Sequence, residues 1–174
     1  MEAINSRDRA LQLLQTYFGY TSFRPAQEAP VESLLKNEDV VAMMPTGAGK
    51  SICFQIPALC KSGLTVVFSP LISLMKDQVD GLVDQNIPAA LTQTEFNKTM
   101  YDVRSGNIKL LYIAPERLGS NFFCNVLRSM PISQVIVDEA HCISQWGHDF
   151  RPSYRLIGDW LASLPKRPVV GGFT

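Results

Sequence analysis

The sequence predicts an α/β domain in which a mainly parallel sheet carries helices on both faces. Short apolar runs rich in β-branched residues alternate with amphipathic helical segments along the chain. Each run is apolar almost throughout, as expected of a strand that is buried on both faces. The length of 174 residues, with 46% apolar and 18% charged side chains, suits one globular domain. These observations favour a single layered α/β domain without internal repeats or linkers.

Two helices are expected before the first strand. Residues 8–18 place apolar side chains at helical spacing, and Gly19 is a natural stop. Pro25 can begin a second helix in the stretch 25–38. Pro30 lies well inside that stretch, where a proline removes an amide donor and crowds the preceding turn. We therefore expect a kink or a late start for the second helix.

The rest of the chain alternates between strand and helix patterns. Strands are expected at residues 39–44, 64–69, 89–92, 109–114, 133–139 and 167–173. Helices are expected at residues 49–62, 71–86, 95–106 and 121–130. A polar and aromatic segment connects the last two strands. Because helices separate the strands, the sheet is expected to be mainly parallel.

Composition and charge narrow the possible functions. Sixteen basic and sixteen acidic side chains cancel, so DNA binding by bulk positive charge is excluded and any nucleic-acid contact must be local. The four cysteines show no CxxC pair and no metal-ligand spacing, and we interpret them as buried, reduced thiols. No apolar run could span a membrane, and the mixed charges at the start do not suit a secretory signal. A cytoplasmic protein without a membrane partner is expected.

Residues 43–51, MMPTGAGKS, contain most of a phosphate-binding loop. The strict pattern is Gly, four residues and Gly-Lys-Ser/Thr, and Met44 occupies its first position. A strand is expected to end at Met44 and a helix to start near Gly49. The loop would then lie beyond the carboxyl end of a strand, where ligands bind in such folds. A chance Gly-Lys-Ser beside a turn is the alternative.

The residue types in this loop suit a triphosphate. Gly47 and Gly49 let the backbone approach the phosphates without an intervening Cβ, and the helix start adds a partial positive charge. Lys50 supplies a full charge for the β and γ phosphates, and the Ser51 hydroxyl can ligate Mg²⁺. The loop therefore predicts ATP and Mg²⁺ as cofactors.

A second motif, VIVDEAH, ends a buried strand in the two carboxylates of Asp138 and Glu139. Magnesium-dependent phosphoryl transfer needs a metal-holding carboxylate at a strand tip and a group that orients or deprotonates water. The alternative is structural, with Asp138 as a helix N-cap and Glu139 in the first turn. Together with the loop, the motif predicts an ATP site.

Five stretches of the chain resemble the superfamily 2 helicases, and most closely the RecQ DNA helicases. In the family's order they are FGYTSFRPAQ (18–27), MPTGAGKS (44–51), SPLISLMKDQV (69–79), LLYIAPERL (110–118) and VDEAHCISQWGHDFRPSY (137–154). The resemblance covers nearly the whole chain, and the last stretch is very specific to RecQ. Loops of the superfamily also begin without the first glycine, which accounts for Met44. Ala48 departs from the glycine that is usual in RecQ loops.

The resemblance implies roles for residues around the nucleotide. Tyr20, Arg24 and Gln27 would recognise adenine, through a ring, a guanidinium and an amide. Residue patterns alone would make Tyr20 a hydrophobic staple and Gln27 a surface residue. The implied phosphate-binding residues are Thr46, Gly47, Ala48, Gly49, Lys50 and Ser51.

The resemblance also implies the catalytic set. Its members are Lys50, Asp138, Glu139 and His141, with Ser51 and Asp138 as the ligands of Mg²⁺. In the family, the histidine links the γ-phosphate site to the nucleic acid. The alternative for His141 is a helix-start histidine that donates to a backbone carbonyl.

A set of nucleic-acid contacts is implied as well. It comprises Ser69, Pro70, Leu71, Arg117, Trp146, His148, Phe150 and Arg151. Aromatic rings interleaved with basic residues suit the bases of a single strand. The alternative is that Trp146 and Phe150 anchor their loop in the core, and one of the two rings can pack inward even if the loop binds DNA.

The resemblance implies that residues 1–174 are the first RecA-like, ATP-binding lobe of a 3′→5′ DNA helicase. Such an enzyme translocates on single-stranded DNA and unwinds duplex junctions in repair and recombination. A second RecA-like lobe is the expected partner, and the lobe alone should hydrolyse almost no ATP. The stretches FRPAQ and KSICFQIPAL suggest a bacterial source, in which the protein is expected to be associated with the nucleoid. A free-standing nucleotide- or DNA-binding module is one alternative, and a P-loop kinase or small-molecule ATPase is another.

Overall fold

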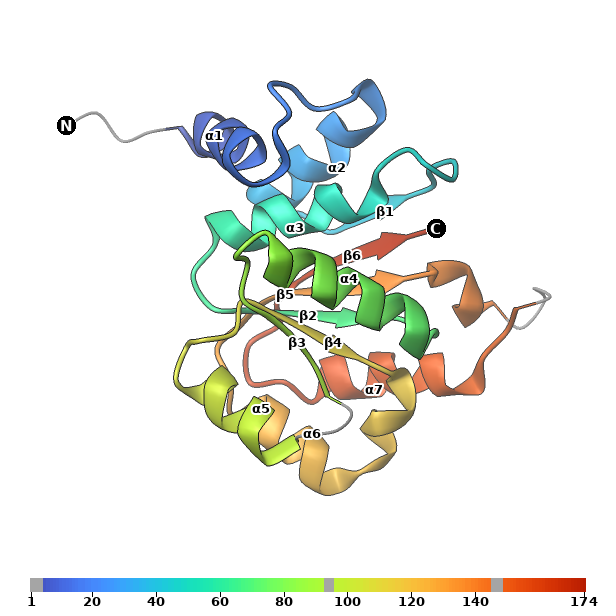
Figure 1. Cartoon of the computed structure of the whole chain (residues 1–174). Coiled ribbons are helices and arrows are strands. Elements are labelled where there is room, and N and C mark those ends of the chain that lie inside the picture. The colour runs from blue at the N-terminus through green and yellow to red at the C-terminus, as the bar shows by residue number, and fades with distance from the viewer. Residues whose placement is uncertain (1–4, 93–95, 145–148) are drawn as a thin grey trace.

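The computed structural model describes residues 5–92, 96–144 and 149–174. The helices are α1 (Ser6–Phe18), α2 (Pro25–Leu35), α3 (Lys50–Cys60), α4 (Ile72–Asp84), α5 (Phe96–Arg104), α6 (Asn121–Arg128) and α7 (Arg155–Ala162). The strands are β1 (Val40–Ala42), β2 (Leu64–Phe68), β3 (Ala89–Leu91), β4 (Leu110–Ile113), β5 (Ile132–Asp138) and β6 (Val169–Phe173). Figure 1 shows the strands side by side between two layers of helices.

The described residues form one sheet of six strands in the order β1-β6-β5-β2-β4-β3, and every pair in it is parallel. All the strands therefore point the same way, and their carboxyl ends lie at one edge of the sheet (Figure 1). This confirms the predicted fold class. It also brings the ends of β1, β5 and β6 together, although β1 is distant from the other two in sequence.

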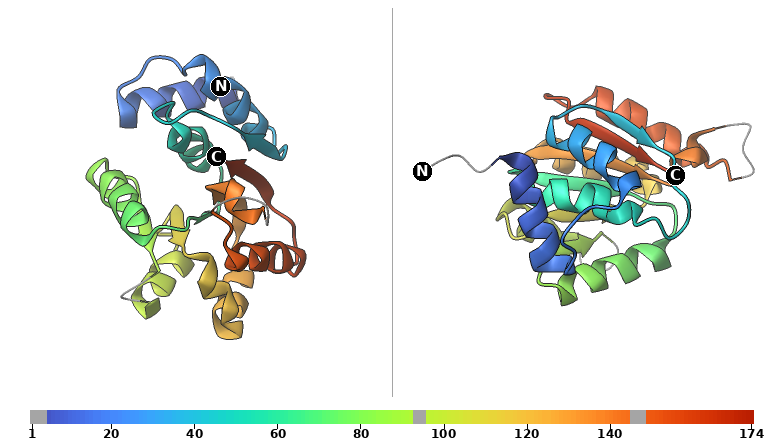
Figure 2. Two further views of the ribbon diagram at one scale, coloured as in Figure 1. Left: turned by 90° about the vertical axis from the view of Figure 1, so that its right-hand side faces the viewer. Right: turned by 90° about the horizontal axis from the view of Figure 1, so that it is seen from above.

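Two hydrophobic cores lie on opposite faces of the sheet. Helices α1 to α4 cover one face, and α5 to α7 cover the other (Figures 1 and 2). All five residues of β2 are buried, with Val67 in the first core and Val66 and Phe68 in the second. This division follows from the alternation of side chains along a strand. A nearly continuous apolar run is therefore what each inner strand requires.

The expected late start of the second helix is wrong. Helix α2 begins at Pro25 and runs through Pro30. Its first turn is fixed by Gln27, whose backbone N–H donates to the Arg24 carbonyl (2.8 Å) while its side-chain Oε1 accepts from the Arg24 N–H (2.9 Å). These contacts hold the helix start in place although Pro30 supplies no amide donor.

The predicted connection between the last two strands contains helix α7 and two 3₁₀ turns, at Ala140–Ile143 and Pro152–Tyr154. Ile157 and Trp160 of α7 are buried, and the Trp160 ring packs edge-on against Phe68 with centroids 5.5 Å apart. Apolar residues three positions apart were the available signal for this helix.

Two further expectations can be compared with the fold. The four cysteines are free thiols, and burial raises the pKa of the Cys53 thiol to about 12. Within the described ranges, no helix combines the length and apolar character that crossing a membrane requires.

Candidate active site

The phosphate loop joins the end of β1 to the start of α3. The Thr174 N–H donates to the Ala42 carbonyl (3.0 Å), and the Met44 N–H donates to the Thr174 carbonyl (2.8 Å). These bonds extend the β1–β6 pairing as far as Met44, whose side chain is buried. Met44 therefore belongs to the strand end, and the position that the strict pattern reserves for glycine needs no glycine here.

Two glycines shape the loop itself. Gly47 has φ 80° and Gly49 has φ 79°, both in the left-handed region that favours glycine. Gly49 is also the N-cap of α3, an 11-residue helix whose first amides have no partner within the helix. A Cβ on Gly49 would lie only 2.4 Å from the Gln27 side-chain nitrogen. The loop thus presents a helix N-terminus to a ligand, and a larger residue at position 49 would require the Gln27 side chain to move.

Side chains of α2 and of its N-cap residue donate hydrogen bonds to backbone carbonyls of this loop. Arg24 donates from Nη1 to the Gly47 carbonyl (2.8 Å). Gln27 donates from Nε2 to the carbonyls of Ala48 (3.2 Å) and Gly49 (3.1 Å). Gln27 is 3% exposed, so the pattern-based interpretation as a surface residue is wrong. Tyr20 is half exposed. Adenine recognition by these three side chains stays a prediction.

The carboxylates of the second motif lie at the tip of β5. Asp138 is almost fully buried, and its Oδ1 accepts from the Glu139 N–H (3.0 Å). Burial raises the pKa of the Asp138 carboxyl, as does the Glu139 charge, whereas the Glu139 N–H and the Lys50 charge act in the opposite direction. Tyr154 donates its hydroxyl to the Asp138 carbonyl (2.8 Å). The carboxylate is therefore held in a fixed, largely desolvated position.

Glu139 has a left-handed backbone, with φ 50°. Such a conformation is strained by about 1–3 kcal/mol for a residue other than glycine and is common at functional sites. Glu139 occupies the N-cap position of the following 3₁₀ turn, and no side chain caps that turn. The alternative of an Asp138 N-cap is therefore wrong.

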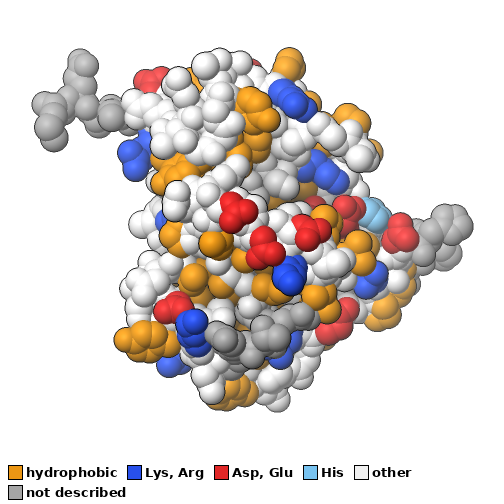
Figure 3. Space-filling view, in the orientation of Figure 1, with side chains coloured by type: hydrophobic (Ala, Val, Ile, Leu, Met, Phe, Trp, Pro, Cys, Tyr) orange, Lys and Arg blue, Asp and Glu red, His pale blue; other side chains and the backbone are white. Residues whose placement is uncertain are grey.

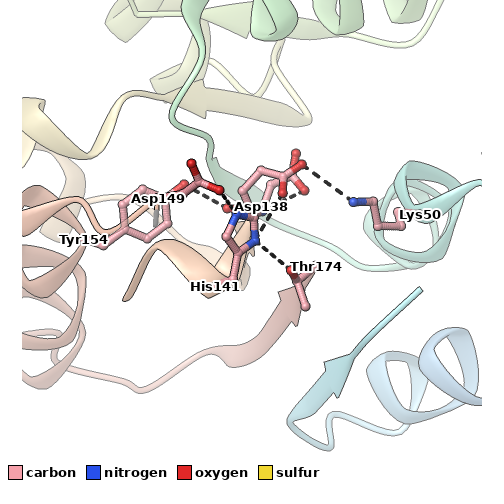
Figure 4. A network of polar contacts seen from close by, with 7 residues as sticks. Lys50, Asp138, His141, Asp149, Tyr154 and Thr174 are labelled. Atoms are coloured by element: carbon pink, nitrogen blue, oxygen red, sulfur yellow. Dashed lines mark hydrogen bonds and ion pairs between the residues drawn. The ribbon is translucent and has the colours of Figure 1, made fainter. Parts of the chain in front are cut away.

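The phosphate loop and the second motif meet at the carboxyl edge. Lys50 Nζ lies 3.6 Å from Glu139 Oε1, and both side chains are about three-quarters buried. Figure 4 shows Lys50 reaching from α3 toward the acidic residues at the end of β5. Lys50 and the acidic pair therefore lie on one side of the molecule, at the carboxyl edge of the sheet.

His141 links several elements at this edge. Its Nδ1 lies 2.7 Å from Thr174 Oγ1 and 3.3 Å from Glu139 Oε2, and its Nε2 lies 3.5 Å from Asp149 Oδ2 (Figure 4). These partners are side chains, not the backbone carbonyl of the alternative interpretation. In the space-filling view, the pale blue histidine lies beside red acidic side chains at the right-hand side of the molecule (Figure 3).

No group of three or more His, Cys, Asp or Glu side chains in the described residues could hold a metal by itself. Magnesium usually needs only one or two carboxylates, and it takes its other ligands from water and substrate phosphates. Asp138 at the strand tip and Ser51 in the first turn of α3 are the residues that could supply such a contribution.

The predicted nucleic-acid residues differ in their exposure and in their contacts. Leu71 is about half exposed beyond the end of β2, and Arg151 donates to the Pro70 carbonyl (3.4 Å), which brings two of the predicted stretches together. Phe150 is partly buried, with the Arg155 guanidinium 5.6 Å from its ring centroid. Ser69 is buried at the end of β2. Trp146 and His148 lie outside the described residues.

The Arg117 side chain makes contacts within the chain. Its Nη2 donates to the Thr92 carbonyl, and its guanidinium lies 5.5 Å from the Phe123 ring centroid. These contacts join the end of β3 to α6. A contact between Arg117 and DNA phosphates stays a prediction.

Comparison with known proteins is consistent with this geometry. The DEAD/DEAH box helicase family matches residues 24–174. The ATP-dependent DNA helicase RecQ of Pasteurella multocida is 46% identical over 94% of this chain, and that of Bacillus subtilis is 48% identical over 95%. The chain spans 27% and 29% of these two relatives, less than a third of their length. A hypothetical ATP-dependent RNA helicase from Sulfolobus tokodaii shares the fold, with a TM-score of 0.70 at 21% identity over 95% of this chain and 50% of that one. The chain therefore belongs to the DEAD/DEAH box helicase family.

Proposed function

We propose that this chain is the ATP-binding, first RecA-like lobe of an ATP-dependent 3′→5′ DNA helicase of RecQ type. The observation that carries the proposal is the approach of Lys50 Nζ to Glu139 Oε1 (3.6 Å) across the tips of β1 and β5. Similarity to RecQ helicases over more than nine-tenths of the chain supports the type of helicase.

The residues at the carboxyl edge fit a magnesium-bound nucleotide. The glycine backbone of the loop leaves space for phosphates, and α3 directs its first amides toward them. Asp138 offers a buried carboxylate that a divalent cation would stabilise in its charged form. ATP with Mg²⁺ would supply the phosphoryl group and the free energy of hydrolysis.

The protein groups would then divide the work of phosphoryl transfer. Lys50 would donate to the β and γ phosphates, and Ser51 with Asp138 would hold the metal. Glu139 would orient water and accept its proton, since its carboxylate lies beside Lys50. Its two contacts, with Lys50 and His141, hold the carboxylate in place before a nucleotide binds.

DNA would bind beyond the same edge, near Leu71, Phe150 and Arg151. A single strand and duplex junctions are the proposed substrates, in repair and recombination on the bacterial nucleoid. A second RecA-like lobe, in the longer protein that the relatives indicate, would complete the ATP cleft. The chain alone should then bind nucleotide weakly and turn over almost none.

The test is ATP hydrolysis by the complete protein, measured with and without single-stranded DNA. Lys50→Ala should abolish turnover in both conditions, because it removes the only charge that the loop offers to the phosphates. Trp146→Ala should keep basal turnover and lose the stimulation by DNA, because base stacking contributes about 1–3 kcal/mol per base.

Three outcomes would contradict the proposal or a part of it. Hydrolysis that single-stranded DNA does not change in the unaltered protein would favour a small-molecule ATPase or kinase. Full DNA stimulation in the Trp146→Ala variant would remove the aromatic-rich loop from the DNA contacts. Brisk, DNA-stimulated turnover by the 174-residue chain alone would show that no second lobe is needed.

A further inference from the structure

A hollow of about 930 Å³ lies at the amino edge of the sheet, opposite the nucleotide site. It is bordered by the loops that lead into the strands, at residues 61–63, 130–133 and 164–169, together with Asn37. In Figure 1 these loops lie at the side from which the strand arrows start. Its volume is at the upper end of the range of about 300–1,000 Å³ that is usual for ligand sites.

The charge of this hollow is one-sided. Four cations line it, at Lys61, Arg128, Lys166 and Arg167, and no carboxylate is among its described lining residues. The whole chain carries no net charge, so this concentration is a local property of the amino edge. Such a local potential attracts anions.

Most of these cations have neutral partners only. Lys61 Nζ donates to Asn37 Oδ1 (2.5 Å), and Arg128 donates from Nε to Ser163 Oγ (2.9 Å) and from Nη1 to Asn125 Oδ1 (2.7 Å). Lys166 forms no ion pair within the part of the chain that the structure describes. Arg167 differs, because Asp39 binds its guanidinium at 2.5 and 3.1 Å.

A further lysine, Lys109, lies next to the residues that line the hollow. The Lys109 ammonium donates to the carbonyls of Lys61 and Gly63, and burial lowers the pKa of both Lys61 and Lys109. Partly buried ammonium groups that meet only carbonyl and amide oxygens are incompletely compensated. An anion that binds in the hollow would give these ammonium groups a negatively charged partner.

The walls between the cations are apolar. Met130, Ile132, Leu164 and Val169 line the hollow, together with prolines at 131, 165 and 168. A bare phosphate or a DNA backbone would leave such walls uncovered, since nucleic-acid contacts are mainly polar and charged. A peptide can cover both parts, with carboxylates on the cations and apolar side chains on the walls.

We propose that the hollow at the amino edge is a docking site for an acidic peptide segment with interspersed apolar side chains. Its carboxylates pair with Lys61, Arg128 and Lys166, and its apolar side chains cover the walls formed by Met130 and Leu164. This site is independent of the nucleotide site, because the two lie at opposite edges of the sheet.

Fluorescence anisotropy with the 174-residue chain tests this site. The probe is a short labelled peptide in which Asp and Glu alternate with Leu and Phe. Lys166→Glu should weaken binding by about fivefold, and Lys61→Gln combined with Lys166→Glu by about tenfold or more, because charge pairs at an interface rim have modest individual effects. A thermal melt shows that each variant is folded. Lys76→Glu, an exposed lysine on α4, is the matched control and should change the affinity less than about twofold.

Competition identifies what the site recognises. A peptide with Asn and Gln in place of the acidic residues should compete only weakly, and a peptide with the acidic residues alone should compete less well than the probe. The proposal is overturned if the labelled peptide does not bind, or if the folded double variant binds it as the wild type does. It is also overturned if duplex DNA or inorganic phosphate displaces the peptide at lower concentration than the unlabelled peptide, since the site would then be a phosphate site.

Discussion

The carboxyl edge of the sheet gathers carboxylates around one lysine, whereas the hollow at the amino edge is lined by cations. At the carboxyl edge, Lys50 faces Glu139 and His141 lies between Glu139 and Asp149, while Asp138 adds a third carboxylate. At the amino edge, cations gather around a hollow that no described carboxylate lines. In the proposals above, an anion would therefore bind the amino edge directly, whereas a triphosphate at the carboxyl edge would need a divalent cation to offset three carboxylates. The predictions below test this contrast.

The largest effect is expected from removing the lysine at the carboxyl edge. Lys50→Ala should weaken nucleotide binding by the 174-residue chain by about 30-fold or more, because a charge-assisted hydrogen bond contributes about 1.5–3 kcal/mol and a phosphate offers several acceptors. A fluorescent ATP analogue with Mg²⁺ gives the affinity. The matched control is Lys61→Ala at the amino edge, which should leave nucleotide affinity unchanged. Equal losses in both variants would mean that the contrast between the edges is wrong.

Two left-handed glycines allow a comparison of stability at the two edges. Gly63 at the amino edge has φ 93°, and a Cβ there would lie 2.5 Å from the Pro131 carbonyl oxygen, which is backbone. The corresponding contact at Gly49 is with the end of the Gln27 side chain, which can move. Gly63→Ala should therefore lower the free energy of unfolding by about 3 kcal/mol, and Gly49→Ala by about 1–2 kcal/mol. Urea unfolding measures both.

Gly158 in α7 is the control for these glycine substitutions. A Cβ at Gly158 would meet no atom within 4 Å, and its backbone is helical. Gly158→Ala should raise the free energy of unfolding by up to about 1 kcal/mol. A larger loss at Gly49 than at Gly63 would show that the Gln27 side chain is fixed as firmly as backbone.

Two aspartates at opposite edges should affect stability with opposite sign. The hydrogen bonds from Arg167 lower the pKa of Asp39, so its contribution is present above the unfolded pKa of about 3.9 and is lost as the pH falls through the lower folded value. Burial raises the pKa of Asp138, so its ionised form destabilises the chain at neutral pH. At pH 7, Asp39→Asn should lower the free energy of unfolding by about 0.5–1 kcal/mol, and Asp138→Asn should leave it unchanged or raise it by about 1 kcal/mol.

Urea unfolding between pH 7 and pH 3 separates these two aspartates. The difference between wild type and Asp39→Asn should shrink as the pH falls below about 4. A pH-independent difference would mean that the Asp39–Arg167 pair contributes through packing and not through charge.

The smallest effect concerns the metal at the amino edge. Mg²⁺ should change the affinity of the acidic peptide by less than about twofold at constant ionic strength, because the described residues that line the hollow include no carboxylate that needs to be offset. Anisotropy titrations with Mg²⁺ and with a chelator make the measurement. A requirement for Mg²⁺ would show that the two edges bind anions in the same way.

The sequence predicted most of the fold because the inner strands are buried on both faces. The apolar run at residues 64–69 corresponds to β2 (Leu64–Phe68), and the run at 133–139 corresponds to β5 (Ile132–Asp138). Helix α7 was missed because it is only eight residues long, about two turns, although Ile157 and Trp160 are three positions apart. A helix of that length depends on tertiary packing more than on its own pattern.

Long-range contacts explain what could not be predicted at the site. The burial of Gln27 arises from the carbonyls of Ala48 and Gly49, which approach only after α2 and the loop have folded together. Arg117 likewise donates to the carbonyl of Thr92, just after β3, although the two residues are 25 positions apart in the sequence. Local patterns contain no sign of either contact. The meeting of Lys50 with the acidic pair could be predicted, because a parallel sheet brings the carboxyl ends of its strands to one edge.

The most direct test is the effect of Mg²⁺ on nucleotide affinity in the wild-type chain and in Asp138→Asn. The fluorescent ATP analogue is titrated with and without Mg²⁺ for each protein. If Asp138 holds the metal, Mg²⁺ should tighten binding by about tenfold or more in the wild type and by less than about twofold in the variant. The same tightening in both proteins would contradict a metal-bound triphosphate between Lys50 and the acidic pair.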